Sequence, residues 1–273
     1  MARKKKISSR VKGYNIALIF VLTILIIALT VVLVTVMFKS KAFYKIESRQ
    51  DEIKENKKTD TEGYSTMGWV RVQGTNIDYP LYALNEAKET FPETKSMLWD
   101  LSLDGKYHNV MLLYGHNIQN LSSKPLKHDK TFIRLEELMN YVYYDFAKEN
   151  KYFQVTIGDK DYVYKIFGVN FMGVDQFYGY SRTDYTKADK KHYIKEILKD
   201  SIYDYDIDVD ENDDIASIVT CSHFFETKSN NFLITGRLIR KNEKVDDYSV
   251  YRNKTYTEKI LPILEGEGLG YEE

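Results

Sequence analysis

The chain has 273 residues, of which 43% are hydrophobic, enough to bury the core of one large or two modest domains. Its 39 basic and 40 acidic residues give a formal net charge of −1, which excludes the strongly basic footprint of a nucleic-acid-binding protein. The single cysteine, Cys221, excludes an internal disulfide, so any stability outside the cell must come from packing.

The N-terminal region joins a basic segment, residues 1–13, to an uncharged run, residues 14–38, which reads YNIALIFVLTILIIALTVVLVTVMF. As a helix this run would be about 37 Å long, more than the ~30 Å hydrocarbon layer of a bilayer. It lacks the small-residue cleavage site of a signal peptide. Because the basic residues precede it, we expect a single-pass anchor in the cell membrane, with residues 1–13 cytoplasmic and the rest of the chain outside.

Residues 39–66 are charge-rich, and we expect a solvated juxtamembrane spacer there. From Met67 short hydrophobic runs separated by turn residues predict a mainly β domain over residues 67–241. Predicted strands cover residues 67–82 with a turn at Gly74, 107–114, a hairpin about Gly158, 215–221 and 231–241. Hydrophobic residues at three- to four-residue spacing predict helices at 131–150 and 187–203.

Two polar segments surround the last two strands. The acidic run DYDIDVDENDD after Tyr203 lacks the glycine and the closing glutamate of a calcium loop, so we expect a solvated turn and no metal. Residues 242–273 are polar and become glycine-rich, and we interpret them as a C-terminal tail.

Cys221 and a histidine are the candidate catalytic residues. A lone cysteine is more often a small buried hydrophobe than a nucleophile, and a nucleophilic one needs a base or cation nearby. His223 would project from the same strand face as Cys221. His116 has the better position, because it follows a predicted buried strand at the start of a loop.

Four motifs in order resemble those of class B sortases: GWVRVQGTNIDYP, VMLLYGHN, SIVTC and FLITG. The resemblance covers about residues 67–240, behind the same kind of N-terminal anchor. It implies a sortase-type β-barrel with added helices, and it matches Cys221 to the nucleophile and His116 to the general acid and base. Ser217 stands where the family usually has threonine, and Val219 where serine is frequent.

The chain departs from the family at the third catalytic residue. Counting back from Gly236 in FLITG, Asn231 occupies the arginine position, which makes it a candidate contact for substrate or oxyanion. An amide offers two donors and no charge, whereas a guanidinium is always charged. Arg237 lies six residues further, about 20 Å along an extended strand, which is too far to replace that arginine. Lys228 in the connecting loop is a mobile alternative cation.

The resemblance implies a membrane-anchored cysteine transpeptidase of Gram-positive bacteria. It would cleave a C-terminal sorting signal of secreted proteins through a thioacyl intermediate and join the product to an amine. The acceptor would be a peptidoglycan precursor, for cell-wall anchoring, or a pilin lysine, for pilus assembly; no metal or organic cofactor is implied. Two alternatives stay open: a sortase-like binding or assembly module with impaired catalysis, motivated by Asn231, and a papain-like hydrolase.

Overall fold

The computed structural model describes residues 18–32, 48–60, 63–84, 98–100, 105–119, 125–127, 133–173, 176, 180, 183–222 and 230–265. The chain divides into two compact units, Met1–Glu47 and Ser48–Glu273.

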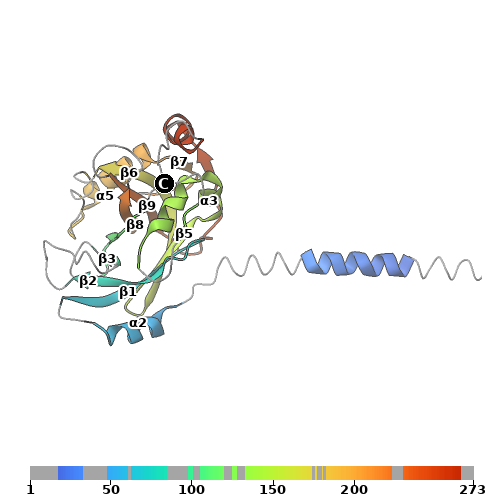
Figure 1. Ribbon diagram of the computed structural model, residues 1–273, viewed down its shortest axis with the longest axis horizontal. Helices are drawn as coiled ribbons and strands as arrows, with labels where there is room; N and C mark the ends of the chain where they lie inside the picture. Colours follow the sequence, from blue (N-terminus) through green and yellow to red (C-terminus); the bar gives the residue numbers. More distant parts are fainter. Residues whose placement is uncertain are drawn as a thin grey trace, which may run out of the picture. The chain divides into compact units, whose positions relative to one another are not determined.

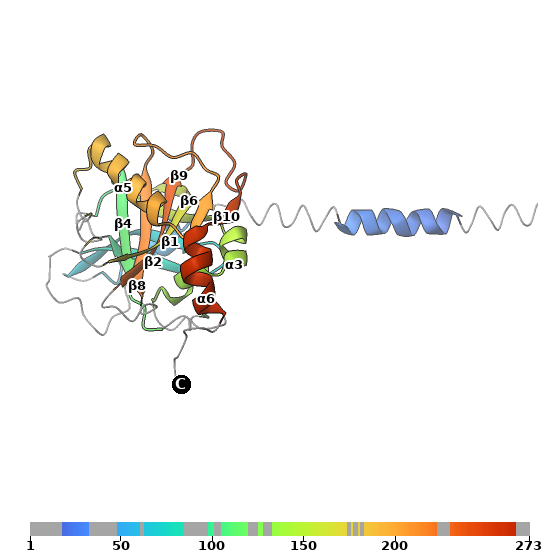
Figure 2. The ribbon, with the colours of Figure 1, turned by 90° about the horizontal axis from the view of Figure 1, so that it is seen from above.

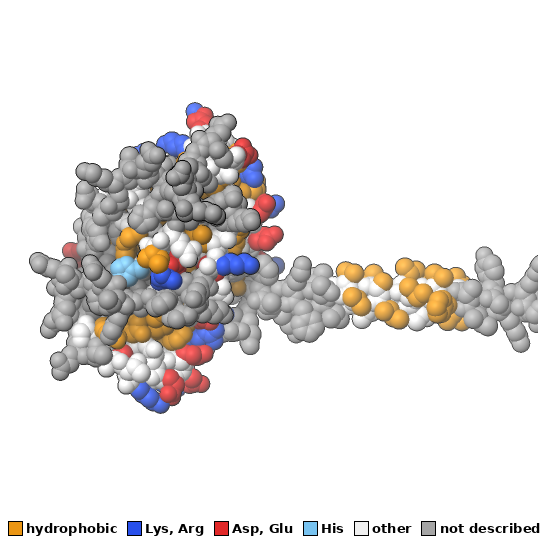
Figure 3. All heavy atoms as spheres, in the orientation of Figure 1, with side chains coloured by type: hydrophobic (Ala, Val, Ile, Leu, Met, Phe, Trp, Pro, Cys, Tyr) orange, Lys and Arg blue, Asp and Glu red, His pale blue; other side chains and the backbone are white. Residues whose placement is uncertain are grey.

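The described part of the first unit is a helix over residues 18–32. Its large hydrophobic side chains are 49–66% exposed, and Figure 3 shows them along the visible face of this helix. Residues 14–17 and 33–38, which complete the expected membrane anchor, lie outside the described residues. Within the described ranges no helix has the length and hydrophobicity needed to span a bilayer.

The second unit is built on a closed eight-stranded barrel in the order β1-β2-β3-β4-β8-β9-β6-β5 (Figure 1). The strands are β1 (Tyr64–Val72), β2 (Asp78–Leu84), β3 (Leu98–Asp100), β4 (Val110–Gly115), β5 (Tyr152–Ile157), β6 (Lys160–Gly173), β8 (Ile215–Ser222) and β9 (Asn230–Leu238). This confirms the expected mainly β fold. The predicted hairpin is β5–β6, with Gly158 at φ 60° in its turn.

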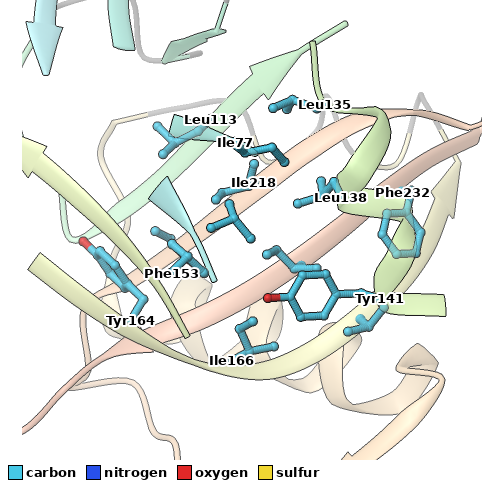
Figure 4. Packing of buried hydrophobic residues seen from close by; sticks show 14 of the residues in the cluster. Ile77, Leu113, Leu135, Leu138, Tyr141, Phe153, Tyr164, Ile166, Ile218 and Phe232 are labelled. Carbon is cyan, nitrogen blue, oxygen red and sulfur yellow. The ribbon is translucent and has the colours of Figure 1, made fainter. Parts of the chain in front are cut away.

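Most neighbouring strands are antiparallel, but β2 and β3 are parallel, and so are β4 and β8. In the second pair, Val110 lies opposite Ile215 and Gly115 opposite Thr220. Side chains from alternating positions fill the barrel and form its main core (Figure 4). Leu113 of β4, Ile218 of β8 and Phe232 of β9 all point into this core.

The opposite face of the same strands is covered by helix α5, Lys187–Asp200 (Figure 2). Thr186 caps the helix and forms a capping box with Asp189, which explains why the predicted helix starts there. Ile197 packs so closely over β6 that a Cβ on Gly168 would lie 2.3 Å from its Cγ2. A second hydrophobic cluster therefore lies between α5 and the outer face of the barrel.

The expected spacer is partly structured, because helix α2 (Gln50–Lys57) packs against β1 of the barrel. Ile53 is buried, and the Arg49 guanidinium donates to the Asp78 carboxylate at 3.0 and 2.6 Å. Trp69 Nε1 donates to the same carboxylate at 2.6 Å. The compact unit, Ser48–Glu273, thus includes this helix.

The single helix expected over residues 131–150 is two short pieces, the 3-10 helix η1 (Glu136–Val142) and α3 (Tyr144–Glu149). Tyr143 between them has an extended backbone, φ −80° and ψ 122°. Every residue of η1 is buried, and several of them belong to the main core, so this segment has no exposed face. The amphipathic interpretation was therefore wrong for residues 136–142.

The expected C-terminal tail is ordered and packed through residue 265, in β10 (Val250–Arg252), the π-helix η2 (Tyr256–Ile260) and α6 (Leu261–Leu264). β10 pairs with β7 (Tyr203–Tyr205) in a separate two-stranded sheet. The segment contributes to the main core, through Tyr248, Val250, Tyr256 and Ile260.

Two buried cations also bind this segment. Lys165 and Arg237, each 2% exposed, both contact the Glu243 carboxylate, at 2.8 Å and 2.5 Å. Lys165 Nζ contacts Asp247 as well, at 2.6 Å. We call these four residues the Glu243 cluster. The acidic turn also binds a cation, because Asp208 and Asp213 accept hydrogen bonds from the Arg240 guanidinium.

Candidate active site

The register of three strands places the sequence-predicted nucleophile and the arginine-position residue in one row. Cys221 of β8 lies directly opposite Asn231 of β9, and Asn231 lies opposite Met172 of β6. Directly opposite residues in antiparallel strands share a face, so the three side chains lie on one surface of the sheet. Cys221 and Met172 both contact the cluster beneath α5, which identifies this surface as the outer face of the barrel.

His116 extends the row on the other side of Cys221. It follows the last residue of β4, Gly115, whose partner in the parallel register is Thr220. The next step of that register sets His116 beside Cys221, and strand alternation gives it the same face as Tyr114, which packs in the outer cluster. Burial lowers the pKa of His116 below its ordinary value of 6.5, so its imidazole is neutral near pH 7 and can accept a proton.

Two polar side chains join the ends of β4 and β8. Thr220 Oγ1 donates to the carbonyl of Gly115 at 2.7 Å. Asn117, which is 5% exposed, donates from Nδ2 to the carbonyl of Cys221 at 3.0 Å and accepts the backbone N–H of Gln119 at 2.8 Å on Oδ1. Both residues that flank His116 in the chain are thereby bonded to the strand that carries Cys221.

Among the described residues the thiol has one hydrogen-bond partner. Tyr114 Oη lies 2.8 Å from Cys221 Sγ, and either atom can be the donor. Tyr114 is opposite Val219, so its ring reaches diagonally along the sheet to the cysteine two positions further. It is 7% exposed, which leaves the phenol little freedom to turn away.

Asn231 has an unsatisfied donor. The side chain is 1% exposed, and its Nδ2 has no hydrogen-bond partner among the described residues. A buried donor without a partner costs free energy of about 1–3 kcal/mol and is uncommon in native proteins. An acceptor atom supplied from outside the chain would satisfy it.

The remaining candidate residues are either bonded elsewhere or lie outside the described residues. Arg237 is held in the Glu243 cluster, with Nε also donating to the Asp208 carbonyl at 2.6 Å, so its guanidinium is engaged away from Cys221. Ser217 is buried and hydrogen-bonded to Tyr193 and Thr235, which gives it a structural role beneath α5. Lys228 and His223 lie outside the described residues.

Tyr114 and Asn117 are the site residues that sequence reasoning missed. Both stand within two positions of His116, and strand alternation through VMLLYGHN would have put Tyr114 on the histidine's face. No local signal could have shown that the phenol meets the cysteine, because this contact depends on the pairing of two distant strands. In the described part of the chain no group of three or more His, Cys, Asp or Glu residues could hold a metal ion.

Both the sequence comparison and the structure comparison find similarity to sortase B proteins. No family model matches the chain. Sortase B of Listeria monocytogenes is 23% identical over 202 residues, which is 70% of this chain and 76% of the relative. A mutant form of Clostridium perfringens sortase B is 21% identical, with a TM-score of 0.55 over 70% of this chain and 89% of that chain. A Staphylococcus aureus sortase B–substrate complex is 19% identical, with a TM-score of 0.52 over 75% and 90%.

The sequence relative and the shared fold point to the same family, and the motifs VMLLYGHN and SIVTC lie on the neighbouring strands β4 and β8. The chain thus shares the fold of the class B sortases and resembles one of them in sequence, and together these findings indicate a class B sortase with cysteine transpeptidase activity.

Proposed function

We propose that this protein cleaves a C-terminal sorting signal of secreted proteins with Cys221 as nucleophile and transfers the acyl group to an amine. The observation that carries the proposal is the row of His116, Cys221 and Asn231 across β4, β8 and β9. A sortase B of the same fold, from Staphylococcus aureus, has been solved as a complex with a substrate, which supports a substrate-binding role for this fold.

The reaction starts with a proton moving from the Cys221 thiol to the neutral His116 imidazole. The thiolate then attacks a backbone carbonyl of the sorting signal, and the C–S bond forms as the carbonyl oxygen becomes an oxyanion. The C–N bond breaks as His116 returns its proton to the departing amine, which leaves a thioacyl enzyme.

In the second half, an incoming amine attacks the thioester and His116 accepts a proton from it. The C–N bond of the product forms, the C–S bond breaks, and the thiolate is regenerated. The proposed acceptor is an amine of a peptidoglycan precursor or a lysine of a pilin, and both acceptors are primary amines that fit this chemistry.

Asn231 contributes a donor where the family has arginine. Its buried Nδ2 stands on the same face as Cys221 and has no partner among the described residues, so an oxyanion or a substrate carbonyl beside the cysteine would satisfy it. The amide donates a directed hydrogen bond but carries no charge. Peptide turnover should therefore depend less on ionic strength than it would at a site built on a cation.

We also propose that residues 14–38 anchor the protein in the cell membrane, with the domain from Ser48 onward on the outer side. The exposed hydrophobic side chains of the helix over residues 18–32 support this part of the proposal, because such a surface is unfavourable in water. Protease added outside intact cells should then digest the domain and leave residues 1–13 protected. Digestion from the cytoplasmic side would contradict this orientation.

The activity test uses the full chain in detergent with a panel of sorting-signal peptides and a primary amine. Mass spectrometry should detect a cleaved peptide, an acyl adduct on Cys221 and an amide product, all absent in Cys221→Ala. Binding without cleavage across the panel would instead favour a sortase-like binding module. Free acid as the main product in the presence of amine would indicate a hydrolase.

A further inference from the structure

We propose that Tyr114 is a catalytic residue that holds the Cys221 thiolate by donating a hydrogen bond from its phenol. This inference rests on the proposed function only in taking Cys221 as the nucleophile. A neutral hydrogen-bond donor then stabilises the sulfur anion at this site.

The contact itself is direct. Tyr114 Oη lies 2.8 Å from Cys221 Sγ, and it is the one hydrogen-bond partner of this sulfur within the described residues. The ring is held in the outer cluster among the side chains of β4, β8 and β9, beneath α5. The phenol therefore meets the sulfur in a fixed position before any substrate binds.

The direction of the bond follows from the charge on the sulfur. A thiol can donate or accept, and it does both weakly. A thiolate has no hydrogen, so Tyr114 must be the donor once the proton has left Cys221. A hydrogen bond that strengthens when its acceptor becomes charged favours the charged form.

The surroundings of the thiol explain why such a donor matters. Asn231, directly across from Cys221, is neutral, and His116 is neutral near pH 7 because burial disfavours its charged form. Within the described residues no lysine or arginine donates a hydrogen bond to the cysteine sulfur. When the thiol ionises, the Tyr114 hydroxyl is thus already in place to donate a hydrogen bond to the negatively charged sulfur.

Alkylation of Cys221 by iodoacetamide tests the proposal, because the thiolate displaces iodide without any sorting signal. We expect Tyr114→Phe in the full chain to react about tenfold more slowly near pH 7, as a lost hydrogen bond to a charged group is worth about 1.5 kcal/mol or more. Well above the ordinary thiol pKa of about 8.5 the two rates should converge, since both cysteines are then ionised.

Tyr82→Phe is the matched control. Tyr82 belongs to the same outer cluster and its hydroxyl also forms a hydrogen bond, from Asn56 at 3.0 Å, but that bond does not involve Cys221. Its alkylation rate should equal that of the wild type. A similar loss in both variants would show that any hydroxyl of the cluster supports the fold, and would overturn the assignment.

Thr220→Val separates the phenol from the strand pairing, because it removes the bond to Gly115 and keeps Tyr114. If it reproduces the Tyr114→Phe profile, loosening of the strands and not the phenol controls the thiol, and the proposal fails. An unchanged rate in Tyr114→Phe near pH 7, or an equal loss at all pH values, would also refute it. If Tyr114→Phe does not fold, Tyr114→Leu supplies the same comparison.

Failure of the proposed function has a different signature. A protein that alkylates with the predicted dependence on Tyr114 but cleaves no peptide would keep this inference and reject the transpeptidase. Normal peptide cleavage by Tyr114→Phe with unchanged alkylation would keep the transpeptidase and reject this inference.

Discussion

Glu243→Gln is expected to destabilise the domain by about 3 kcal/mol at neutral pH, although Glu243 lies in the segment that sequence reasoning treated as a tail. Hydrogen bonds from Arg237 and then Lys165 outweigh the opposing effect of burial and lower the pKa of Glu243 from 4.5 to about 2. A carboxyl with that difference between unfolded and folded states contributes about 3 kcal/mol above its unfolded pKa. Removing one partner of buried ion pairs costs about 3–5 kcal/mol, which agrees.

The pH dependence gives a sharper test than the magnitude. Because the folded pKa is lowered, the contribution is present in full above about pH 4.5 and is lost as the pH falls toward about 2. The difference in free energy of unfolding between wild type and Glu243→Gln should therefore shrink to about 1 kcal/mol near pH 3. Urea unfolding of the compact unit from Ser48 onward, followed by fluorescence, measures both values.

Glu258→Gln is the matched control for this prediction. Glu258 makes an ion pair with Lys254 at 3.6 Å, with the two side chains 61% and 83% exposed. Exposed pairs of this kind contribute under about 0.5 kcal/mol. A difference for Glu243→Gln below about 1 kcal/mol at neutral pH, or one that is independent of pH, would refute the account of the Glu243 cluster.

Three further outcomes follow from the site and its supports. Asn231→Arg should preserve or raise peptide turnover, measured by mass spectrometry, whereas a loss as deep as that of Cys221→Ala would mean that the site is built around the amide. Asn117→Ala should lower peptide turnover about tenfold, because the substitution frees the loop after His116. The alkylation rate of Cys221 should stay within about twofold, because the Tyr114 phenol remains in place. Equal losses in both assays would contradict this. Asp78→Asn should lower the free energy of unfolding by about 1–2 kcal/mol near pH 7, measured by urea unfolding. The difference should fade in acid, because hydrogen bonds outweigh burial and hold the pKa of the Asp78 carboxyl below its ordinary value. A difference that is independent of pH would exclude a charge effect.

The elements that sequence reasoning predicted well are those whose signals are local. Helix α5 has a capping box at Thr186 and hydrophobic residues on one face, and both are visible in the chain. The hairpin about Gly158 is defined by a turn glycine between two hydrophobic runs. In each case neighbouring residues alone decide the structure.

The elements that were missed depend on distant partners. The tail is polar in composition, yet Glu243 is positioned by Lys165 and Arg237, which lie on two other strands. The η1 segment has helical spacing, but its polar residues are buried too, as with Glu137, which accepts the backbone N–H of Asn76. Contacts with distant partners override the local pattern in both segments.

The candidate site was half predictable for the same reason. Cys221 and His116 follow from motifs, and Asn231 follows from counting along the last strand. The contact of Tyr114 with the cysteine requires the register of β4 against β8, which no single sequence displays. The Nδ2 of Asn231, which has no partner among the described residues, likewise emerges only from the pairing of distant strands.

The parallel pairing of β4 with β8 has a consequence for how such an enzyme can diversify. Gly115 and Thr220 are 105 positions apart in the chain, and the segment between them supplies β5 and β6 of the same barrel as well as α5. Changes confined to the connecting loops of that segment leave the pairing of β4 with β8 in place, and with it the separation of the two reacting groups. The loops can therefore vary independently of the catalytic chemistry, whereas the strands between them cannot.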